Sequence, residues 1–325
     1  MSLPSGKVLP LETAFRSTFH DKYDFDDFLS ATAEKESTPV VLKKRSPHET
    51  TVFVGTEKLK RFHRFLNSYL FEFADINTRI ADAYIKGKNT LTSVRKHATN
   101  SHFFRTDIVD FFGQLSRIDA NRVLERQLGA APISDFSDYR EVILGIVLMN
   151  DSLPMGFSTS PSISNACLFE FDNAIEQHCN ERNIIYSRYS DDLIFSSSSQ
   201  EKLSHIDSML KEQLQRHFDG RLRLNSAKTT RTHAGNKVNL LGLVILPNGH
   251  VTVDNKIKKN LEVLLHFYRS EQEKYRDFLI REYSGHVSKV SGQLRYVNTI
   301  DPNYVRKLRS RYGNLLIDYF LGNPE

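Results

Sequence analysis

Two short segments of the chain place carboxylates directly beside apolar runs. Asp107 ends the run that contains Phe103 and Phe104, and Asp191 and Asp192 stand together between two other apolar runs. Adjacent carboxylates repel each other unless a cation or hydrogen-bond donors neutralise them. Mg²⁺ is a hard ion that is bound by a few carboxylates together with substrate phosphates. Each segment alone is better explained as an acidic turn, but the two together predict a cleft in which carboxylates converge on divalent cations.

Carboxylates from two separate strands suit the transfer of a nucleotide to a 3′-hydroxyl. That reaction uses two divalent ions about 3.5–4 Å apart, one activating the hydroxyl and one binding the leaving pyrophosphate. A turn-rich loop at residues 153–161 lies between the two acidic segments. Asn225-Ser226-Ala227-Lys228 and Leu240-Leu241-Gly242-Leu243 follow them. Five segments in this order are much harder to dismiss than any one of them.

In this order the segments resemble the palm motifs of reverse transcriptases. The acidic strand with its two phenylalanines resembles the first catalytic motif, and the Leu-Pro-x-Gly loop resembles the template and nucleotide loop. Tyr189-Ser190-Asp191-Asp192 resembles the Tyr-x-Asp-Asp box. Lys228 matches the motif lysine that is proposed to protonate pyrophosphate, and Leu-Gly-Leu resembles the primer grip. The resemblance covers roughly residues 40–320.

The resemblance implies a role for each matching residue. Asp107, Asp191 and Asp192 would form the catalytic acidic cluster and hold two Mg²⁺ ions, with Mn²⁺ as a substitute. The backbone carbonyl of Ile108 would be a further metal ligand, and Lys228 would act as a general acid. The other positions would bind the nucleotide (Asp110, Phe112, Met155 and Gly156) or nucleic acid (Tyr189, Leu241 and Gly242).

Phe112 bears on which nucleotide is used. In the family this position is the steric gate, where a bulky ring collides with a ribose 2′-hydroxyl. RNA-directed RNA polymerases have a carboxylate at this spacing and hydrogen-bond the 2′-hydroxyl instead. The resemblance therefore implies a DNA product. In a strand, the side chains of Phe111 and Phe112 would leave opposite faces, so that only one of them could be core.

The family binds the triphosphate with basic residues of a hairpin in the fingers. Residues 39–54 show two β-branched runs around a Ser-Pro turn and predict that hairpin. Thr50 stands where the family has arginine, so Lys43, Lys44 and Arg45 are the nearest candidates. Met155 replaces the family's Gln, which contacts the nucleotide sugar and the template.

The positive charge of the chain is concentrated in residues 255–325. They contain 13 Lys and Arg against 8 Asp and Glu, whereas residues 1–254 contain 31 of each. Such an excess is typical of a surface that binds a phosphate backbone, although a solvated helical face has it too. The resemblance makes this segment the thumb, with Lys256, Lys258, Lys259, Arg306, Lys307, Arg309 and Arg311 as candidate phosphate contacts.

The patterns together predict an α+β right-hand polymerase with fingers, a palm built on an antiparallel sheet, and a helical thumb. We expect an N-terminal extension at residues 1–34, fingers and palm at 35–254, and the basic thumb at 255–325. A polar connector at 32–39 would precede the hairpin. Helices are predicted at 57–84, 119–128, 138–150, 162–180 and 200–217, strands at 102–112, 183–190, 192–198 and 221–225, and a hairpin at 238–253 that turns at Pro247-Asn248-Gly249.

Composition disfavours several other classes. Cys167 and Cys179 are too few for a structural zinc site, and we expect both to be unpaired on helices. No apolar run approaches the roughly 20 residues that span a bilayer. Residues 1–15 lack the apolar core of a signal peptide. We therefore expect a cytoplasmic protein without a membrane partner.

The short chain resembles the bacterial reverse transcriptases of the retron and other defence-associated groups, which copy a dedicated non-coding RNA. The expected partners are that RNA template, deoxynucleotides and the DNA product, and also a partner effector protein or a second polymerase subunit. Departures from the retron pattern at Ser93–His97 and Leu240–Gly242 favour another defence-associated group.

Two alternatives remain open. One is a protein-primed or untemplated DNA polymerase of the phage-exclusion type, and the other is a mainly RNA-binding scaffold of the same fold. The intact Asp107, Asp191 and Asp192 argue against the scaffold, because an unused buried acidic cluster would be destabilising.

Overall fold

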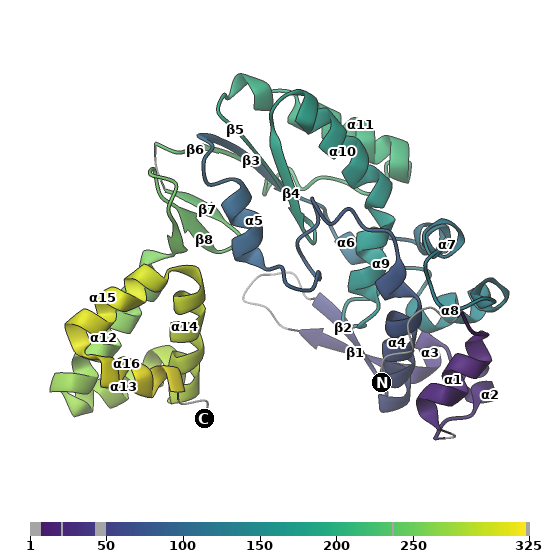
Figure 1. Ribbon diagram of the computed structural model, residues 1–325, viewed down its shortest axis with the longest axis horizontal. Coiled ribbons are helices and arrows are strands. Elements are labelled where there is room, and N and C mark those ends of the chain that lie inside the picture. The colour runs from purple at the N-terminus through teal and green to yellow at the C-terminus, as the bar shows by residue number, and fades with distance from the viewer. Residues whose placement is uncertain (1–7, 21, 43–49, 236, 323–325) are drawn as a thin grey trace. The chain divides into compact units, whose positions relative to one another are not determined.

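A computed structural model of the chain describes residues 8–20, 22–42, 50–235 and 237–322 (Figure 1). The chain divides into two compact units. The first unit contains residues 1–87, 104–195 and 201–230, and the second contains residues 88–103, 196–200 and 231–325. Lys43, Lys44 and Arg45, the candidates for triphosphate binding, lie outside the described residues.

The first unit begins with helices whose aromatic side chains enter its core. Phe15 and Phe28 pack against Phe62 and Phe65, and none of the four residues is more than 2% exposed. Rings in offset or edge-to-face contact add to the free energy gained by their burial. These rings belong to α1 (Leu11–Phe19), α2 (Phe25–Ser30) and α4 (Glu57–Tyr69), and the short helix α3 (Ala33–Glu36) lies between α2 and α4 in the sequence.

The predicted hairpin is confirmed, but the connector before it is wrong. Strands β1 (Ser37–Leu42) and β2 (Thr50–Gly55) pair antiparallel, with Ser37 opposite Gly55 and Leu42 opposite Thr50. Residues 32–39 are not a loop, because the side chain of Thr32 caps α3 and β1 follows at once.

The helix predicted at 57–84 is too long. It ends at Tyr69, since Leu70 has a φ of −127° and a ψ of −68°. A 3₁₀ turn (η1, Phe71–Phe73) and a loop follow. The other helices of the first unit are α6 (Phe111–Gln114), α7 (Arg117–Arg126), α8 (Arg140–Val147) after the 3₁₀ turn η2 (Phe136–Tyr139), α9 (Ser160–Cys167), α10 (Phe169–Glu181), and α11 (Ile206–Phe218) after η3 (Glu201–Leu203).

A four-stranded sheet in the order β4-β5-β3-β6 carries both acidic segments. Its strands are β3 (His102–Asp107), β4 (Ile185–Tyr189), β5 (Asp192–Ser197) and β6 (Thr230–His233). Ser101 pairs with Ser197 and Ile108 with Asp191, so β3 and β5 run antiparallel. The strand predicted at 221–225 is wrong, because there only Leu224 makes a bridge, an isolated one with Ile108.

The second unit combines a small sheet with a bundle of helices, which Figure 1 draws in green to yellow. The antiparallel sheet β7-β8-β9 confirms the hairpin that turns at Pro247-Asn248-Gly249. Helix α5 (Thr90–Lys96) packs on β8 and β9. The other elements are β7 (Val238–Leu240), β8 (Leu243–Ile245), β9 (Val251–Val253), α12 (Asn255–Ser270), α13 (Gln272–Tyr283), α14 (Val287–Ile300), α15 (Pro302–Tyr312) and α16 (Asn314–Gly322).

Two further sequence predictions concern the cysteines and the membrane. Cys167 and Cys179 are free and lie on α9 and α10. Across the described ranges, the structure contains no helix of the length and apolarity needed to cross a bilayer.

Candidate active site

Asp107 and Asp191 enter one cavity from neighbouring strands. Asp107 is the last residue of β3, and Asp191 lies in the turn between β4 and β5. The backbone N–H of Ile108 donates to the carbonyl of Asp191 at 3.1 Å, which fixes the two segments side by side. Both aspartates and Ile108 line a cavity of about 880 Å³ within the first unit. The expected convergence of acidic strand ends is therefore present for these two residues.

The carboxylate of Asp107 has one satisfied and one unsatisfied oxygen. Asp107 is 6% exposed, and its Oδ2 accepts a hydrogen bond from the ammonium group of Lys228 at 2.6 Å. Its Oδ1 is buried and has no hydrogen-bond partner among the described residues. A buried anionic oxygen without a donor costs free energy. Asp107 therefore fits a ligand of a hard cation, because only one of its oxygens is neutralised by the protein.

Asp191 is destabilised as an anion in the same cavity. Burial raises the pKa of its carboxyl group, and the neighbouring charges of Asp192 and Asp107 raise this pKa further. A cation between these groups would reverse the effect, because opposite charge favours the ionised form. The electrostatics of the cavity therefore favour the binding of positive charge at Asp107 and Asp191.

Asp192 is bound by an arginine and does not enter the cavity with the other two aspartates. Its Oδ1 accepts hydrogen bonds from Nη2 and Nε of Arg105, at 2.8 and 3.0 Å. It does not line the cavity, and no three His, Cys, Asp or Glu side chains of the described residues are grouped closely enough to hold a metal ion. The structure thus brings two of the three predicted acidic residues together. Sequence reasoning missed Arg105, although a cation two residues before Asp107 on a strand was a usable signal.

The two phenylalanines after the acidic strand lie in a helix. Asp110 precedes α6 with a φ of 42°, and Phe111 and Phe112 form its first turn, so the strand expected here is wrong. Both rings line the cavity, while Phe111 also lies in the core at 4% exposure and Phe112 is half-buried. Consecutive helical residues point about 100° apart, so one ring can be core while the other faces the cavity.

The loop that contains Met155 packs against the hairpin of β1 and β2. The backbone N–H of Phe53 donates to the carbonyl of Met155 at 2.8 Å. Gly156 has a φ of 106°, and a Cβ atom there would lie 2.5 Å from the carbonyl oxygen of Phe53. Only glycine fits both the backbone conformation and this close approach. Met155 and Thr50 both line the cavity. Thr50 is the residue at the position where the family has arginine.

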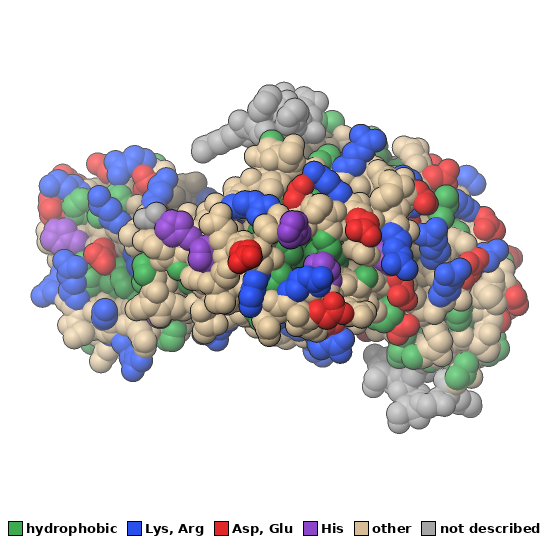
Figure 2. Space-filling model, turned by 90° about the horizontal axis from the view of Figure 1, so that it is seen from above, with side chains coloured by type: hydrophobic (Ala, Val, Ile, Leu, Met, Phe, Trp, Pro, Cys, Tyr) green, Lys and Arg blue, Asp and Glu red, His purple; other side chains and the backbone are tan. Residues whose placement is uncertain are grey.

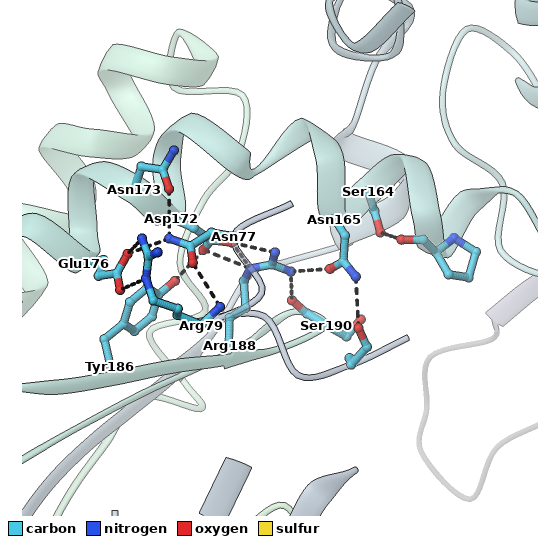
Figure 3. A network of polar contacts seen from close by, with 12 residues as sticks. Asn77, Arg79, Ser164, Asn165, Asp172, Asn173, Glu176, Tyr186, Arg188 and Ser190 are labelled. Carbon is cyan, nitrogen blue, oxygen red and sulfur yellow. Dashed lines mark hydrogen bonds and ion pairs between the residues drawn. The ribbon is translucent and has the colours of Figure 1, made fainter. Parts of the chain in front are cut away.

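A buried polar network lies behind the turn between β4 and β5 that carries Asp191 (Figure 3). Arg188 is fully buried on β4 and donates from Nε to both carboxylate oxygens of Asp172 at 3.0 Å. Its Nη1 donates to Asn165 Oδ1 at 2.9 Å and to the carbonyl of Ser190 at 3.2 Å. Ser190 has a φ of 59°. The network therefore fixes the turn that carries Asp191, and sequence reasoning missed it because an arginine in a strand usually faces solvent.

The predicted nucleic-acid-binding residues lie in both units. Tyr189 is the half-buried last residue of β4, and burial raises the pKa of its hydroxyl group. Leu241 and Gly242 form the two-residue turn between β7 and β8, with φ values of 51° and 77°. Positive φ at both positions is typical of a type I′ hairpin turn. A leucine in this backbone conformation is unusual. The paired strands β7 and β8 on either side hold the turn in it.

The basic residues of the C-terminal helices are partly neutralised. Lys258 pairs with Asp301 at 3.0 Å, and Arg309 pairs with Asp318 at 2.7 Å. Arg306 donates to Asn303, and Arg311 pairs with Glu262 at 3.4 Å. Figure 2 shows Lys and Arg side chains interspersed with Asp and Glu side chains over the visible face. Four of these residues remain exposed, with no carboxylate at ion-pair distance within the described part of the chain: Lys256, Lys259, Lys307 and Arg306, whose partner Asn303 is uncharged.

Known proteins with similar sequences point to one family. Residues 54–245 match the reverse transcriptase (RNA-dependent DNA polymerase) family. The retron Ec83 reverse transcriptase of Escherichia coli is 23% identical over 317 residues, which cover 95% of this chain and 96% of the relative. The retron Ec73 reverse transcriptase of the same organism is 25% identical over 81% of this chain and 82% of its own length.

Solved structures with a similar fold include telomerase from Candida albicans in complex with a fragment of telomeric RNA. It superposes with a TM-score of 0.50 at 11% identity, over 88% of this chain and 61% of the telomerase chain. This likeness supports the polymerase fold alone. The likeness to retron enzymes extends over nearly the whole chain, so the departures at Ser93–His97 and Leu240–Gly242 do not set the chain apart from them. The chain belongs to the reverse transcriptases, the RNA-dependent DNA polymerases, and is of the bacterial retron type.

Proposed function

We propose that this reverse transcriptase extends a DNA strand on an RNA template with two Mg²⁺ ions, bound by Asp107 and Asp191 with the Ile108 carbonyl. Polymerases of this family generally use divalent metal ions. The proposal is carried by Asp107, which lines the same cavity as Asp191 and has a buried Oδ1 atom that lacks a protein donor. When bound, the ions would activate the 3′-hydroxyl and neutralise the leaving pyrophosphate.

Lys228 and Asp192 support this site from either side. The hydrogen bond to Asp107 raises the pKa of Lys228, so its side chain is protonated at neutral pH. Its side chain is 66% exposed and can carry this proton to the leaving pyrophosphate. Asp192 adds negative charge beside Asp191 while its own carboxylate is balanced by Arg105. We assign Lys228 as the general acid and Asp192 as the third member of the acidic cluster.

The nucleotide would occupy the part of the cavity formed by α6 and the loop before α9. Asp110, which precedes α6, and Phe112 of α6 line it on one side, and Met155 lines it from the loop. Phe112 would exclude a ribose 2′-hydroxyl by contact, and Asp110 would orient the sugar or the triphosphate. Gly156 allows the loop to lie against the hairpin that would close over the triphosphate.

We also propose that the template is a dedicated non-coding RNA in a system of anti-phage defence, as the resemblance of the sequence motifs to the retron and other defence-associated enzymes implies. We further propose fingers and palm at residues 35–254 and a thumb at 255–325.

To test the proposed template, the RNA that copurifies with the protein would be extracted and sequenced. One abundant structured RNA, with a DNA copy attached or alongside, is the expected result. A random sample of cellular RNA would contradict the dedicated template.

Binding of Mn²⁺ and Mg²⁺ to the purified protein tests the metal site without relying on catalysis. Electron paramagnetic resonance would measure the binding of Mn²⁺, and competition would measure that of Mg²⁺. Asp107→Asn and Asp191→Asn should each weaken binding at least about tenfold, because each removes a charged ligand at a cost of about 1.4 kcal/mol or more. Asp318→Asn, on the exposed pair with Arg309, is the matched control and should bind like the wild type. Unchanged affinity in both cavity variants would refute the assignment.

A further inference from the structure

Tyr84 has a backbone conformation that its residue type does not explain. Its φ is 60°, in the left-handed region that tyrosine rarely adopts. Its side chain is not drawn there by burial either, since the residue is 53% exposed. Strained residues of this kind persist only where the surrounding structure holds them, and they gather at functional sites. An exposed residue in a strained conformation therefore suggests that Tyr84 binds a ligand.

The strain at Tyr84 is imposed by buried contacts on the segment before it. The backbone N–H of Asp82 donates to the carbonyl of Arg188 at 2.9 Å, and that of Arg188 donates to Ile80 at 3.0 Å. The Nδ2 of Asn165 donates to the carbonyl of Ala83 at 2.9 Å. Asn165 is in turn bound by Arg188, which also donates to the carbonyl of Ser190 (Figure 3). Arg188 thus fixes both residues 80–83, which precede Tyr84, and the turn that contains Ser190 and Asp191.

The Tyr84 side chain reaches the turn between β4 and β5 that carries Asp191. Its hydroxyl group lies 3.2 Å from Oγ of Ser190, the residue next to Asp191. Tyr84 also lines the cavity that contains Asp107 and Asp191. In nucleotidyl transfer the 3′-hydroxyl of the primer must reach these carboxylates, so its nucleotide must lie beside this turn. Exposed aromatic rings that meet nucleic acid bind it by stacking, without regard to base identity.

We propose that Tyr84 is a binding residue for the 3′-terminal nucleotide of the primer. Its ring stacks on this nucleotide, and its hydroxyl group anchors the ring to Ser190. The proposal rests on the proposed function only in that a primer end occupies the cavity. The rigid, strained backbone holds the ring in place before binding, which reduces the entropy lost when the nucleotide docks.

Primer–template binding in the absence of divalent metal tests this role separately from catalysis. Tyr84→Gly removes the ring and tolerates the positive φ, whereas Tyr84→Asn also tolerates it but keeps a side chain. Both should weaken binding about tenfold, equivalent to about 1.4 kcal/mol, with an unchanged or higher Tm. Tyr84→Phe keeps the ring and should bind within about twofold of the wild type. Wild-type affinity in the Gly and Asn variants would overturn the proposal, as would an equal loss in Tyr84→Phe.

An abasic nucleotide identifies the stacking partner. An abasic primer terminus should weaken binding to the wild type but cause no further loss in Tyr84→Gly, since the contact is already gone. Coupling to an abasic template position instead would overturn the assignment to the primer. If the wild type bound primer in this pattern but extended none, the proposed catalysis would fail while the role of Tyr84 stood. If it extended primers and Tyr84→Gly bound them equally well, only the role of Tyr84 would fail.

Discussion

At the scale of single residues, the site balances two cations against three crowded carboxylates. Lys228 neutralises one oxygen of Asp107, Arg105 neutralises Asp192, and Asp191 has a pKa raised by burial and by these neighbours. An anion whose pKa is raised in the folded state destabilises the fold at neutral pH, because stability is lost as the pH rises through that pKa. Function and stability therefore oppose each other at Asp191.

Replacement of Asp191 by Asn should separate the two effects. Asn has nearly the same shape but no charge, so the Tm of Asp191→Asn in chelator at pH 7 should equal or exceed that of the wild type. Nucleotide incorporation with Mg²⁺ should fall at least about a hundredfold, as when a preorganised electrostatic group is removed. Thermal scans and single-turnover kinetics provide the measurements. A clear drop in Tm would mean that the carboxylate stabilises the fold and is not held there for catalysis.

Phe112 gives a prediction about sugar selection. Phe112→Ala should raise the incorporation of ribonucleotides relative to deoxynucleotides at least about tenfold, because one lost steric contact is worth about 1–3 kcal/mol of discrimination. Competing nucleotides in one primer-extension reaction would measure the ratio. Phe218→Leu, a conservative change in the core at a residue that does not line the cavity, is the control. An unchanged ratio would show that the gate lies elsewhere.

At the scale of elements, the buried contacts between helices include a histidine that must stay neutral. His63 of α4 is 2% exposed, and its Nε2 lies 3.0 Å from the carbonyl of Ile146 on α8. Its ring packs on Phe157 with a centroid distance of 4.5 Å. Burial lowers the pKa of His63 from 6.5 to about 4. The packing of α4 on α8 therefore depends on pH.

Acid should weaken the fold through His63. Between pH 6.5 and about 4 the unfolded chain binds a proton at this position and the folded chain does not. The free energy of unfolding therefore falls as the pH drops, by about 3 kcal/mol over the full window. His63→Gln should lose less stability than the wild type between pH 7 and pH 5, as urea unfolding would measure. Other acid-sensitive groups, such as His97, act equally in both proteins, so parallel pH profiles would contradict this account.

The sequence predicted elements where chemistry and periodicity agreed. The hairpin of β1 and β2 followed from two β-branched runs around a turn, and the strands next to Asp107 and Asp191 followed from apolar runs that end in carboxylates. The helix predicted from Glu57 is too long: the apolar residues at helical spacing that predict it end at Leu70, and there the backbone leaves the helix. Tertiary contacts decided that boundary, and they are invisible in a periodic pattern.

The supporting residues of the site were harder to predict. Arg105 and Arg188 lie in strands, where a cation is most often solvent-exposed, yet each binds a carboxylate from a distant segment. The left-handed backbone of Tyr84 is not encoded by its residue type. These features depend on which segments meet in space, which one sequence does not reveal.

At the scale of the whole molecule, the net charge of +5 should attract nucleic acid. A Lys or Arg side chain that contacts a phosphate releases counterions from the nucleic acid. We expect this from cations that are not already paired with a carboxylate. Lys259 and Lys307 are exposed and have no carboxylate partner in the ranges that the structure covers, whereas Arg309 is paired with Asp318. Lys259→Ala or Lys307→Ala should reduce the slope of log Kd against log salt by about one each. Arg309→Ala should change it less. Titrations at several salt concentrations would decide, and equal slopes throughout would remove these lysines from the interface.

Primer extension tests the central claim most directly. The purified protein would receive an RNA template, a DNA primer, Mg²⁺ and either deoxynucleotides or ribonucleotides, beside Asp107→Asn, Asp191→Asn and the control Asp318→Asn. We predict templated extension with deoxynucleotides alone in the wild type and the control, and none in the two cavity variants. Undiminished synthesis in either cavity variant would contradict the proposed metal site. DNA that did not match the template, or that was attached to the protein, would contradict conventional templated synthesis.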